Sequence, residues 1–518
     1  MLARRALSAL LALAALAAPP WLAARVCDAP AGRGRALVYV SGPEPETLDP
    51  ALATGLPEVR LLTALFEGLV ALDPRTLEPR PAAAEAWDAD PDGVTFRLRE
   101  GLRFGDGSPL AAADFAYAFD RVREPRTGSP WAEAVSGLEW RALDPRTLRI
   151  AGPRARGDLL ARLTLPCFYP VARGAVEAHG ERWTRPGSLV SNGPFRLAAW
   201  EINRRIGLER NPHFRAPVGI EAVVALTVDG PSVGFNLYAT GAADIVHSVP
   251  AALLPDLAGR ADLHTGPLLA TYFLRMNVGR PPFDDPHARR AFALAIDREA
   301  IVRHVTRSGE PVARSLCPPG MGGYEPGGGP AGWFDPAEAR RELEASRYGG
   351  ARGLPEVEYL YEGAANGRIG EVLQDQWLRH LGVRVRLRPM ERKVAFATVR
   401  AREYQIAWSS WVADYPDAAN FLEVFESGSG NNRTGYADPE YDALLERARR
   451  AKGDDRLGRL AEAEALLLEA APIAPIYHYA RGVLVSPRVR GFVSNPLNRI
   501  DWTALELAPG PAGGARSP

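Results

Sequence analysis

The sequence YQIAWSSWVADYPDAANFLEVF, at residues 404–425, is the most unusual window of the chain. Trp408 and Trp411 lie in an apolar run with the pattern of a β-strand, and this run ends at Asp414. A carboxylate beside two indoles is expected to be partly buried there, and a buried charge normally needs a partner. The amine of a ligand would be one such partner. The alternative is that Asp414 caps the following turn, with Pro416 ending the strand, and the residues alone favour this simpler interpretation.

Helix and strand patterns alternate along the rest of the chain. Val94, Phe96 and Leu98 alternate with polar residues, as they would in a half-buried strand. With 518 residues, the chain is too long for one ordinary core and should divide into two or three lobes. We therefore predict α/β lobes. Amphipathic helices are expected at residues 111–123, 286–303, 335–347, 369–381 and 439–452, and short strands at residues 356–361 and 383–387.

The first residues carry the pattern of a secretory signal. Arg4 and Arg5 precede an apolar run at residues 6–18, which two prolines follow. This run is shorter than the roughly 20 residues that a membrane-spanning helix needs. We therefore expect residues 1–26 to be a signal peptide and the mature protein to be soluble outside the cytoplasmic membrane, in the periplasm or cell envelope.

The three cysteines leave several possibilities open. Lipid attachment at Cys27 is the less favoured alternative to simple cleavage, because Val26, rather than a small residue, precedes it. Cys167 and Cys317 are far apart in the sequence. They form either a disulfide or two isolated buried thiols, and the sequence does not decide between these.

Composition and missing motifs exclude several classes of protein. The 62 basic and 62 acidic side chains cancel, without the basic excess typical of nucleic-acid binders. The sequence contains no Walker A motif, dinucleotide-binding glycine fingerprint or Gly-x-Ser-x-Gly elbow. The eight histidines are at least 17 positions apart, so no helix offers a local histidine pair to zinc. We therefore expect a protein that is not an enzyme and has no cofactor, metal site or nucleic-acid partner.

A series of short motifs runs through the chain in a fixed order. They are TLDP at 47–50, LFEGL at 65–69, AEAW at 84–87, TFRLR at 95–99, FGDGSP at 104–109, DF at 114–115, SNGPF at 191–195, ERNP at 209–212, MN at 276–277, PFDD at 282–285, AIDR at 295–298 and NN at 431–432. With the window at 404–425, this order resembles the oligopeptide-binding proteins of ABC importers. They belong to family 5 of the extracytoplasmic solute-binding proteins, which also includes dipeptide, murein-peptide and nickel receptors.

The resemblance implies a fold and a function. The fold would be an α/β, bilobed periplasmic-binding-protein fold of class C, which is type II-like, with an extra small domain. A closing cleft between the lobes would bind short peptides, and the receptor, acting as a monomer, would deliver them to the permease and ATPase subunits of an ABC importer. Lobe I would combine residues 36–66, 187–269 and 482–508, the small domain would span 67–186, lobe III would span 270–481, and residues 509–518 would be a disordered tail.

The resemblance also implies which residues bind the ligand. In this family an aspartate at the position of Asp414 pairs with the α-amino group of the peptide, and Trp411 matches a tryptophan of the binding pocket. Trp131, Trp408 and Asn277 are further expected ligand-binding residues. For the tryptophans, plain core packing is the alternative interpretation.

Main-chain pairing is the second implied mode of ligand contact. The backbone of Ser410 and Val412, and that of an opposite segment from Thr54 to Leu56, would pair with the peptide as added strands. Such pairing supplies affinity without reading side chains, which suits a receptor for many sequences.

Three departures from the family pattern concern the predicted site. A disulfide of well-known oligopeptide receptors falls on Ala270 and Val412, so both cysteines are missing together. An arginine of the ligand site falls on Trp408, and a histidine that meets the peptide C-terminus falls on Gly367. The resemblance therefore does not assign the residues that bind the peptide carboxylate. Candidate replacements are Arg368 and Arg400.

Two alternatives to peptide capture are kept. The same fold could bind a dipeptide, a murein peptide, a nickel chelate or an opine-like compound. A protein of another class, an exported peptide hydrolase, would need a nucleophile or metal that the sequence does not show.

Overall fold

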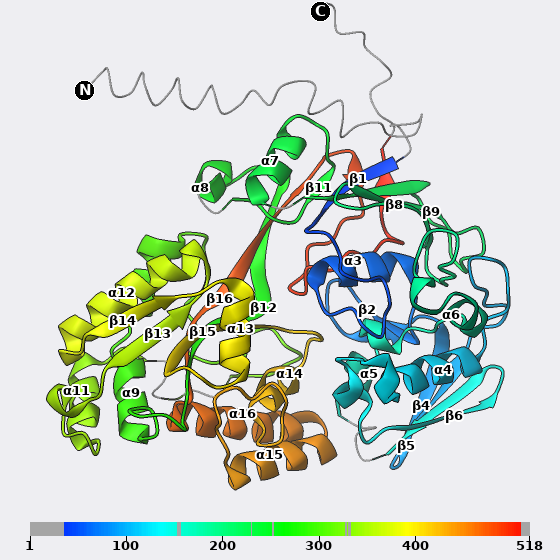
Figure 1. Ribbon diagram of the computed structural model, residues 1–518. Helices are drawn as coiled ribbons and strands as arrows, with labels where there is room; N and C mark the ends of the chain where they lie inside the picture. The colour runs from blue at the N-terminus through cyan, green and yellow to red at the C-terminus, as the bar shows by residue number, and fades with distance from the viewer. Residues whose placement is uncertain are drawn as a thin grey trace, which may run out of the picture. The chain divides into compact units, whose positions relative to one another are not determined.

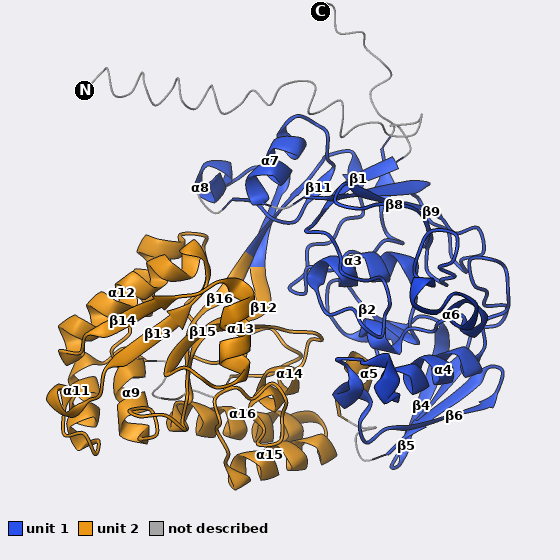
Figure 2. Ribbon diagram, in the orientation of Figure 1, with its two compact units in different colours: residues 1–155, 163–266, 481–518 blue, residues 156–162, 267–480 orange. Residues whose placement is uncertain are grey.

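A computed structural model gives the architecture of the chain. The chain divides into two compact units (Figure 2): unit 1 comprises residues 1–155, 163–266 and 481–518, and unit 2 comprises residues 156–162 and 267–480. The predicted signal peptide, Cys27 and the predicted tail lie outside the described residues, and the division into two lobes and a small domain stays a prediction. The structure describes residues 36–152, 157–228, 230–250, 253–326, 329 and 333–508.

Among the described residues, unit 1 contains two larger sheets and two two-stranded sheets, β2-β3 and β17-β18. Parallel pairing joins β1 to β10 and β11, while β9 pairs antiparallel with β10 and β8. The second larger sheet has the order β4-β5-β7-β6, and α4 packs against β6 and β7 (Figure 1). The strands are β1 (Ala36–Gly42), β2 (Val70–Leu72), β3 (Pro79–Pro81), β4 (Ala84–Asp90), β5 (Gly93–Leu98), β6 (Glu139–Asp144), β7 (Thr147–Ala151), β8 (Phe195–Glu201), β9 (Arg205–Arg210), β10 (Ala222–Thr227), β11 (Ile245–Val246), β17 (Val489–Arg490) and β18 (Glu506–Leu507).

The helices of unit 1 are short. The longest, α4, is amphipathic and buries Phe115, Phe119 and Val122. They are α3 (Leu56–Leu65), α4 (Ala112–Arg123), α6 (Arg173–His179), α7 (Pro231–Ala239) and α8 (Leu254–Leu257), with single turns η1 (Pro125–Thr127), η2 (Ala132–Val135), η3 (Pro166–Phe168) and η4 (Gly180–Arg182).

Unit 2 is built on a mixed sheet with the strand order β14-β13-β15-β12-β16. The strands β12 and β16 each begin in one unit and end in the other. Helix α12 packs along β13 and β14, and α11 packs on α9 and α12 (Figure 1). The strands are β12 (Leu263–Met276), β13 (Val357–Tyr361), β14 (Val385–Pro389), β15 (Ile406–Val412) and β16 (Ile473–Val485).

The helices of unit 2 include the longest of the described residues. They are α5 (Leu159–Arg162), α9 (Pro286–Leu294), α10 (Arg298–Ile301), α11 (Pro336–Ala345), α12 (Gly363–Leu381), α13 (Arg392–Arg400), α14 (Ala419–Leu422), α15 (Pro439–Arg450) and α16 (Gly453–Ala470), with η6 (Val302–Thr306), η8 (Ala351–Gly353) and η9 (Glu423–Phe425). No helix of the described residues combines the length and apolar character needed to cross a bilayer.

One predicted helix is interrupted. The pattern at residues 286–303 predicts a continuous helix, but α9 ends at Leu294 and α10 begins at Arg298. The carboxylate of Asp297 accepts from the Ala300 N–H at 2.9 Å, which is an N-cap that starts a new helix. The prediction of one helix was therefore wrong, because a capping aspartate fits an apolar spacing without continuing the helix.

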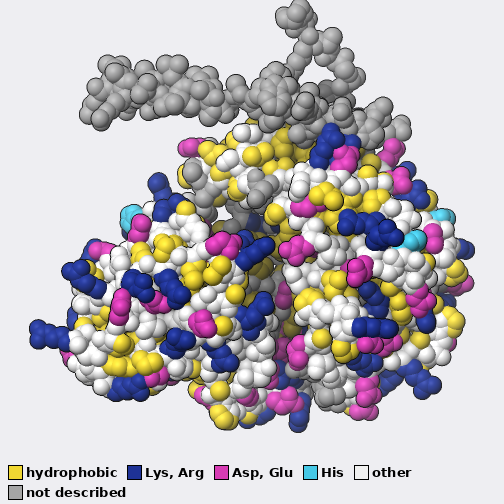
Figure 3. All heavy atoms as spheres, viewed as in Figure 1, with side chains coloured by type: hydrophobic (Ala, Val, Ile, Leu, Met, Phe, Trp, Pro, Cys, Tyr) yellow, Lys and Arg dark blue, Asp and Glu magenta, His cyan; other side chains and the backbone are white. Residues whose placement is uncertain are grey.

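The surface charges and the two described cysteines bear on the expectations from the sequence. Basic and acidic side chains are interspersed on the face shown in Figure 3. Cys167 and Cys317 are both buried and do not form a disulfide with each other, the former being in unit 1 and the latter in unit 2. The alternative of two separate buried thiols, rather than a disulfide, is therefore confirmed.

A buried ion pair holds the first loop of unit 1. The Asp49 carboxylate accepts hydrogen bonds from Arg121 of α4 at 2.7 and 3.2 Å, from the indole of Trp183 at 3.0 Å and from the Ala51 N–H at 2.9 Å. Asp49 is 5% exposed. A buried carboxylate with this many donors ties its loop to α4 and to the segment that carries Trp183.

Removing this carboxylate should destabilise unit 1. Asp49→Ala leaves the charge of Arg121 largely buried without its partner, and such truncation costs about 3–5 kcal/mol. Urea unfolding should show this loss, while Asp88→Ala, at an exposed position, should change the free energy of unfolding by less than about 0.5 kcal/mol. An Asp49→Ala protein as stable as the parent would contradict the role of this ion pair.

A buried histidine joins two strands of unit 2. The Thr271 hydroxyl of β12 donates to the Leu316 carbonyl at 2.7 Å and therefore accepts from Nδ1 of His478 in β16, at 2.8 Å. Burial lowers the pKa of His478 from 6.5 to about 4. The folded protein therefore holds this imidazole neutral.

This shift predicts a pH dependence of stability. Because the pKa of His478 is about 4 in the folded protein and about 6.5 when unfolded, the unfolded chain binds the proton first as pH falls. The contribution of neutral His478 to the free energy of unfolding is complete above about pH 6.5. It is lost as the pH falls from about 6.5 to 4, and the loss amounts to about 3 kcal/mol in all. His478→Gln should flatten unfolding free energy against pH in that window, whereas His179→Gln, at an exposed position, should not.

Candidate functional site

Strand β15 is paired unequally on its two sides. Its whole length, Ile406–Val412, pairs antiparallel with β12. On the other side β13 reaches only Ile406 and Ala407. In the part of the chain that the structure describes, no strand pairs with the remaining side, at residues 408–412, which we call the open edge.

Two hydrogen bonds decide which peptide groups face the open edge. The Ala413 N–H donates to the Leu269 carbonyl at 2.7 Å, and the Asn277 N–H donates to the Gln405 carbonyl at 3.0 Å. Peptide groups alternate between the two sides of a strand, so the odd-numbered residues of β15 face β12. Trp408, Ser410 and Val412 therefore direct their N–H and C=O groups to the open edge. Ser410 and Val412 are exposed there, and Val412 is 40% exposed.

The open edge ends at the predicted carboxylate. The Asn420 side-chain oxygen accepts from the Trp411 indole and from the Asp414 N–H, both at 3.0 Å, and its NH₂ group donates to the Asp414 carboxylate at 3.3 Å. Asn420 is 8% exposed. One buried amide therefore fixes Trp411 and Asp414 relative to each other. The following helix, α14, is capped by Asp417, which accepts from the Ala419 N–H at 2.9 Å.

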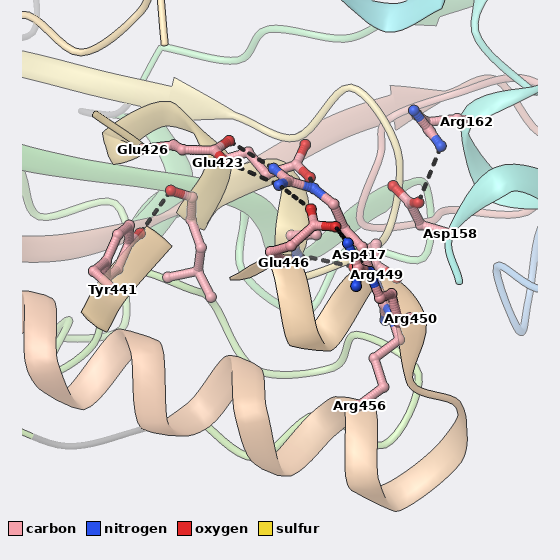
Figure 4. Close-up of polar contacts among 12 residues, drawn as sticks. Asp158, Arg162, Asp417, Glu423, Glu426, Tyr441, Glu446, Arg449, Arg450 and Arg456 are labelled. Carbon is pink, nitrogen blue, oxygen red and sulfur yellow. Dashed lines mark hydrogen bonds and ion pairs between the residues drawn. The ribbon is translucent and has the colours of Figure 1, made fainter. Parts of the chain in front are cut away.

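Buried charges hold the loop that follows Asp414 (Figure 4). Tyr415 donates to Asp158 at 2.8 Å. Arg162 lies 3.4 Å from the same carboxylate, and Arg456 pairs with Asp417 at 2.7 Å. Burial raises the pKa of Asp417, against the charge of Arg456. Burial also acts to raise the pKa of Asp158, but the charges of Arg162 and Arg456 lower it overall.

A second group of charges fixes the next turn. Arg449 of α15 donates to Glu423 at 3.0 Å and to Glu426 at 2.6 Å (Figure 4). Burial disfavours its charge, yet the hydrogen bond with Glu426 and the charge of Glu423 raise the pKa of Arg449. The chain from Asp414 to Glu426 is thus anchored at both ends, which suits a carboxylate that must keep one position.

The other predicted residues of unit 2 have defined surroundings. Trp408 is 9% exposed, and its ring lies 5.7 Å from that of Phe396 in α13. The Asn277 NH₂ group donates to the carbonyls of Arg402 and Tyr404, at 2.8 and 3.0 Å. The Asn277 side chain therefore supports a turn. A role for Asn277 or Trp408 in ligand binding stays a prediction.

The remaining predicted residues belong to unit 1. The Trp131 indole donates to the Ala53 carbonyl at 2.8 Å, and this contact braces the segment that follows. Thr54 is exposed, and Leu56, the first residue of α3, is 38% exposed. Their predicted contact with a ligand main chain stays a prediction.

The missing disulfide positions face each other. Ala270 of β12 and Val412 of β15 are direct partners in the antiparallel register. Gly367 lies in α12, where an added Cβ would come within 3.0 Å of the Tyr361 ring. A side chain at this position would therefore need Tyr361 to shift.

Sequence reasoning missed Asn420. It lies inside the unusual window, but an asparagine that bonds a tryptophan and an aspartate across a turn has no periodic signal. Among the described residues, no group of His, Cys, Asp or Glu side chains is arranged to hold a metal ion.

Comparison with known proteins identifies the family. The family described as Bacterial extracellular solute-binding proteins, family 5 Middle, matches residues 78–433. The chain belongs to this family. Its members among the similar proteins include the periplasmic oligopeptide-binding protein OppA of Salmonella typhimurium, which is 32% identical over 92% of this chain and 94% of its own length.

Solved structures of the family 5 solute-binding proteins confirm the fold. The murein tripeptide binding protein MppA of Escherichia coli superposes with a TM-score of 0.81 at 29% identity, covering 92% of this chain and 99% of its own. OppA of Haemophilus influenzae, solved in complex with the peptide RPPGFSPFR, gives a TM-score of 0.79 at 27% identity over 92% and 99% of the two chains. The predicted family and the predicted α/β periplasmic-binding-protein fold are therefore confirmed.

The Asn420 amide gives a direct structural test. Asn420→Ala removes three hydrogen bonds and leaves buried donors unsatisfied, so the free energy of unfolding should fall by about 1–3 kcal/mol. Urea unfolding measures this change. Asn431→Ala, at an exposed position of the same unit, should leave stability unchanged within about 0.5 kcal/mol. Equal stability of the two variants would show that the amide does not organise the loop.

Proposed function

We propose that this family 5 protein captures short peptides outside the cytoplasmic membrane and delivers them to an ABC importer. The peptide main chain pairs with the open edge of β15, and its α-ammonium group pairs with Asp414. The observation that carries the proposal is the position of this carboxylate: it directly follows a strand edge whose peptide groups at Trp408, Ser410 and Val412 face no other strand of the described residues.

Physical chemistry favours a peptide as the ligand of such an edge. An extended chain that adds to a sheet gains main-chain hydrogen bonds irrespective of its side chains. A carboxylate at one end of the edge then fixes direction and register, because only the N-terminus carries an ammonium group. Relatives that are named as periplasmic oligopeptide- and murein-peptide-binding proteins support the same ligand class.

The proposal has consequences for partners and chemistry. The permease and ATPase subunits of an importer would be the partners, and the receptor would act as a monomer. It would perform no catalytic step, since binding and release suffice for delivery. Residues 1–26 would direct export as a signal peptide.

Removing the charge of Asp414 tests the amine-binding role. Asp414→Asn should weaken binding of a free tripeptide by about 2–5 kcal/mol, as for the loss of one partner of a buried charge pair. Isothermal titration calorimetry measures the affinity, and an N-acetylated tripeptide should bind the parent protein with a similar loss. Asp88→Asn, at an exposed position of unit 1, is the matched control. If acetylation leaves the affinity unchanged, Asp414 does not bind the ammonium group.

The natural ligand can be identified directly. Mass spectrometry of molecules that co-purify with the protein from cells should show short peptides of mixed sequence. A single metal chelate or a single non-peptide compound in their place would contradict peptide capture while leaving the family assignment intact.

A further inference from the structure

Three segments of unit 2 meet at the end of β12 and carry arginines into one place. The Val278 N–H donates to the Thr434 carbonyl at 3.0 Å, and the Tyr404 hydroxyl donates to the Arg433 carbonyl at 2.7 Å. Asn277 holds the turn at Arg402, as described above. Arg275 of β12, Arg400 at the end of α13, Arg402 and Arg433 are thereby gathered; we call these four residues the arginine cluster.

The arginine cluster is not neutralised by the described part of the protein. None of its four guanidinium groups forms an ion pair or donates a hydrogen bond to a described residue. Arg275 is only 8% exposed, its Nε has no hydrogen-bond partner there, and its nearest aromatic contact is the Phe273 ring at 5.6 Å. A buried donor without a partner is costly, and native proteins rarely leave one.

Other buried arginines of unit 2 have the hydrogen-bond acceptors that Arg275 lacks. Arg298 donates to the carbonyls of Pro475 and Ile296, at 2.5 and 3.0 Å. Arg289 donates to the carbonyls of Ala470 and Phe283, both at 2.8 Å. These side chains are satisfied by the fold itself. Arg275 has no such carbonyl partner, which marks its surroundings as a place for an external acceptor.

Repulsion couples Arg433 to the other three members of the cluster. Burial lowers the pKa of Arg433, and the charges of Arg400 and Arg402 lower it further. Burial also lowers the pKa of Arg275 to about 10, with a contribution from Arg433. The arginine cluster therefore concentrates positive charge without a counter-charge from the described residues.

We propose that the arginine cluster is a carboxylate-binding pocket that makes this receptor select peptides with an acidic side chain. This inference rests on the proposed peptide-binding function and adds the class of peptide. Arginine forms paired, charge-assisted hydrogen bonds with carboxylates, and these are among the strongest that a side chain can make. In the register of β12 and β15, Arg275 is opposite Ala407, five residues from Val412, or about 17 Å along the strand.

The fixed position of the cluster favours a side chain over the peptide C-terminus. In a peptide anchored at its N-terminus by Asp414, the C-terminal carboxylate moves by about 3.3 Å with every added residue. A side chain counted from the N-terminus keeps its place whatever the peptide length. A cluster with its buried member, Arg275, on β12 therefore suits Glu or Asp at one set position of the ligand.

Calorimetry with a peptide series tests this inference. The series consists of heptaalanine peptides with Glu at one of positions 2 to 6, since about 17 Å corresponds to about five residues of an extended chain. The matching Gln peptides are included, and each peptide is made with a free or amidated C-terminus. The parent protein should bind the Glu peptide at one position at least tenfold more tightly than the Gln peptide. In the double variant R400Q/R433Q this preference should fall below threefold.

Two further variants keep the test independent of folding. Arg392→Gln removes an exposed arginine of the same helix, α13, and should retain the full preference for Glu. Arg275→Met removes the buried charge with a side chain of similar length, and thermal unfolding checks that it is folded. It should lose the preference while still binding the Gln peptides.

The outcomes separate this inference from the proposed function. Equal binding of Glu and Gln peptides by the parent, or a preference that survives R400Q/R433Q, would overturn the acidic-side-chain pocket and leave peptide capture intact. Sensitivity to C-terminal amidation but not to Glu→Gln would also overturn it, because the terminus would then be the bound carboxylate. Failure of every peptide to bind would remove the proposed function and this inference with it.

Discussion

The antiparallel register between β12 and β15 is the constraint on which the candidate site depends. Seven residue pairs define it, from Ala270–Val412 to Met276–Ile406, and the hydrogen bonds from Ala413 to Leu269 and from Asn277 to Gln405 extend it at either end. A slip of one residue would turn the peptide groups of the open edge toward β12 and exchange the two faces of the strand. The same pairing places Asp414 beyond one end of β15 and Arg275 near the other. One register therefore sets the direction in which the proposed ligand runs.

Buried polar contacts turn that register into a rigid site. Asn420 joins Trp411 and Asp414, and ion pairs at Asp417 and Arg449 anchor the chain on either side of α14. Each buried charge here is paired, since an uncompensated charge in this region would be costly. Arg275 is a buried exception in unit 2, while Arg400 and Arg402 of the arginine cluster are exposed and Arg433 is partly exposed. We infer that the acceptor for Arg275 is supplied by the ligand.

Much of the fold was predictable, because the spacing of apolar residues along a helix or strand indicates which of its faces is buried. Helices α11, α12 and α15 and strands β13 and β14 overlap the ranges expected from periodicity. The break at Asp297 was not predictable, because a capping aspartate does not disturb that spacing. The motif order was sufficient to identify the family, which the comparisons confirm.

The site was only partly predictable from the sequence. Asp414 stood out because it ends an apolar, tryptophan-containing run. Asn420, Arg275 and Arg433 did not, since their importance comes from contacts that the tertiary fold makes between distant segments. No local pattern distinguishes an arginine without a partner from one that is paired.

The direct pairing of Ala270 with Val412 has a practical consequence. Where related receptors carry a covalent link between these strands, this chain relies on hydrogen bonds and packing alone. Cys167 and Cys317 are separate buried thiols, so the described residues contain no bond that a reductant could cleave. The strand pair should therefore form equally well in a reducing cytosol and in an oxidising compartment, and its assembly needs no oxidative folding machinery.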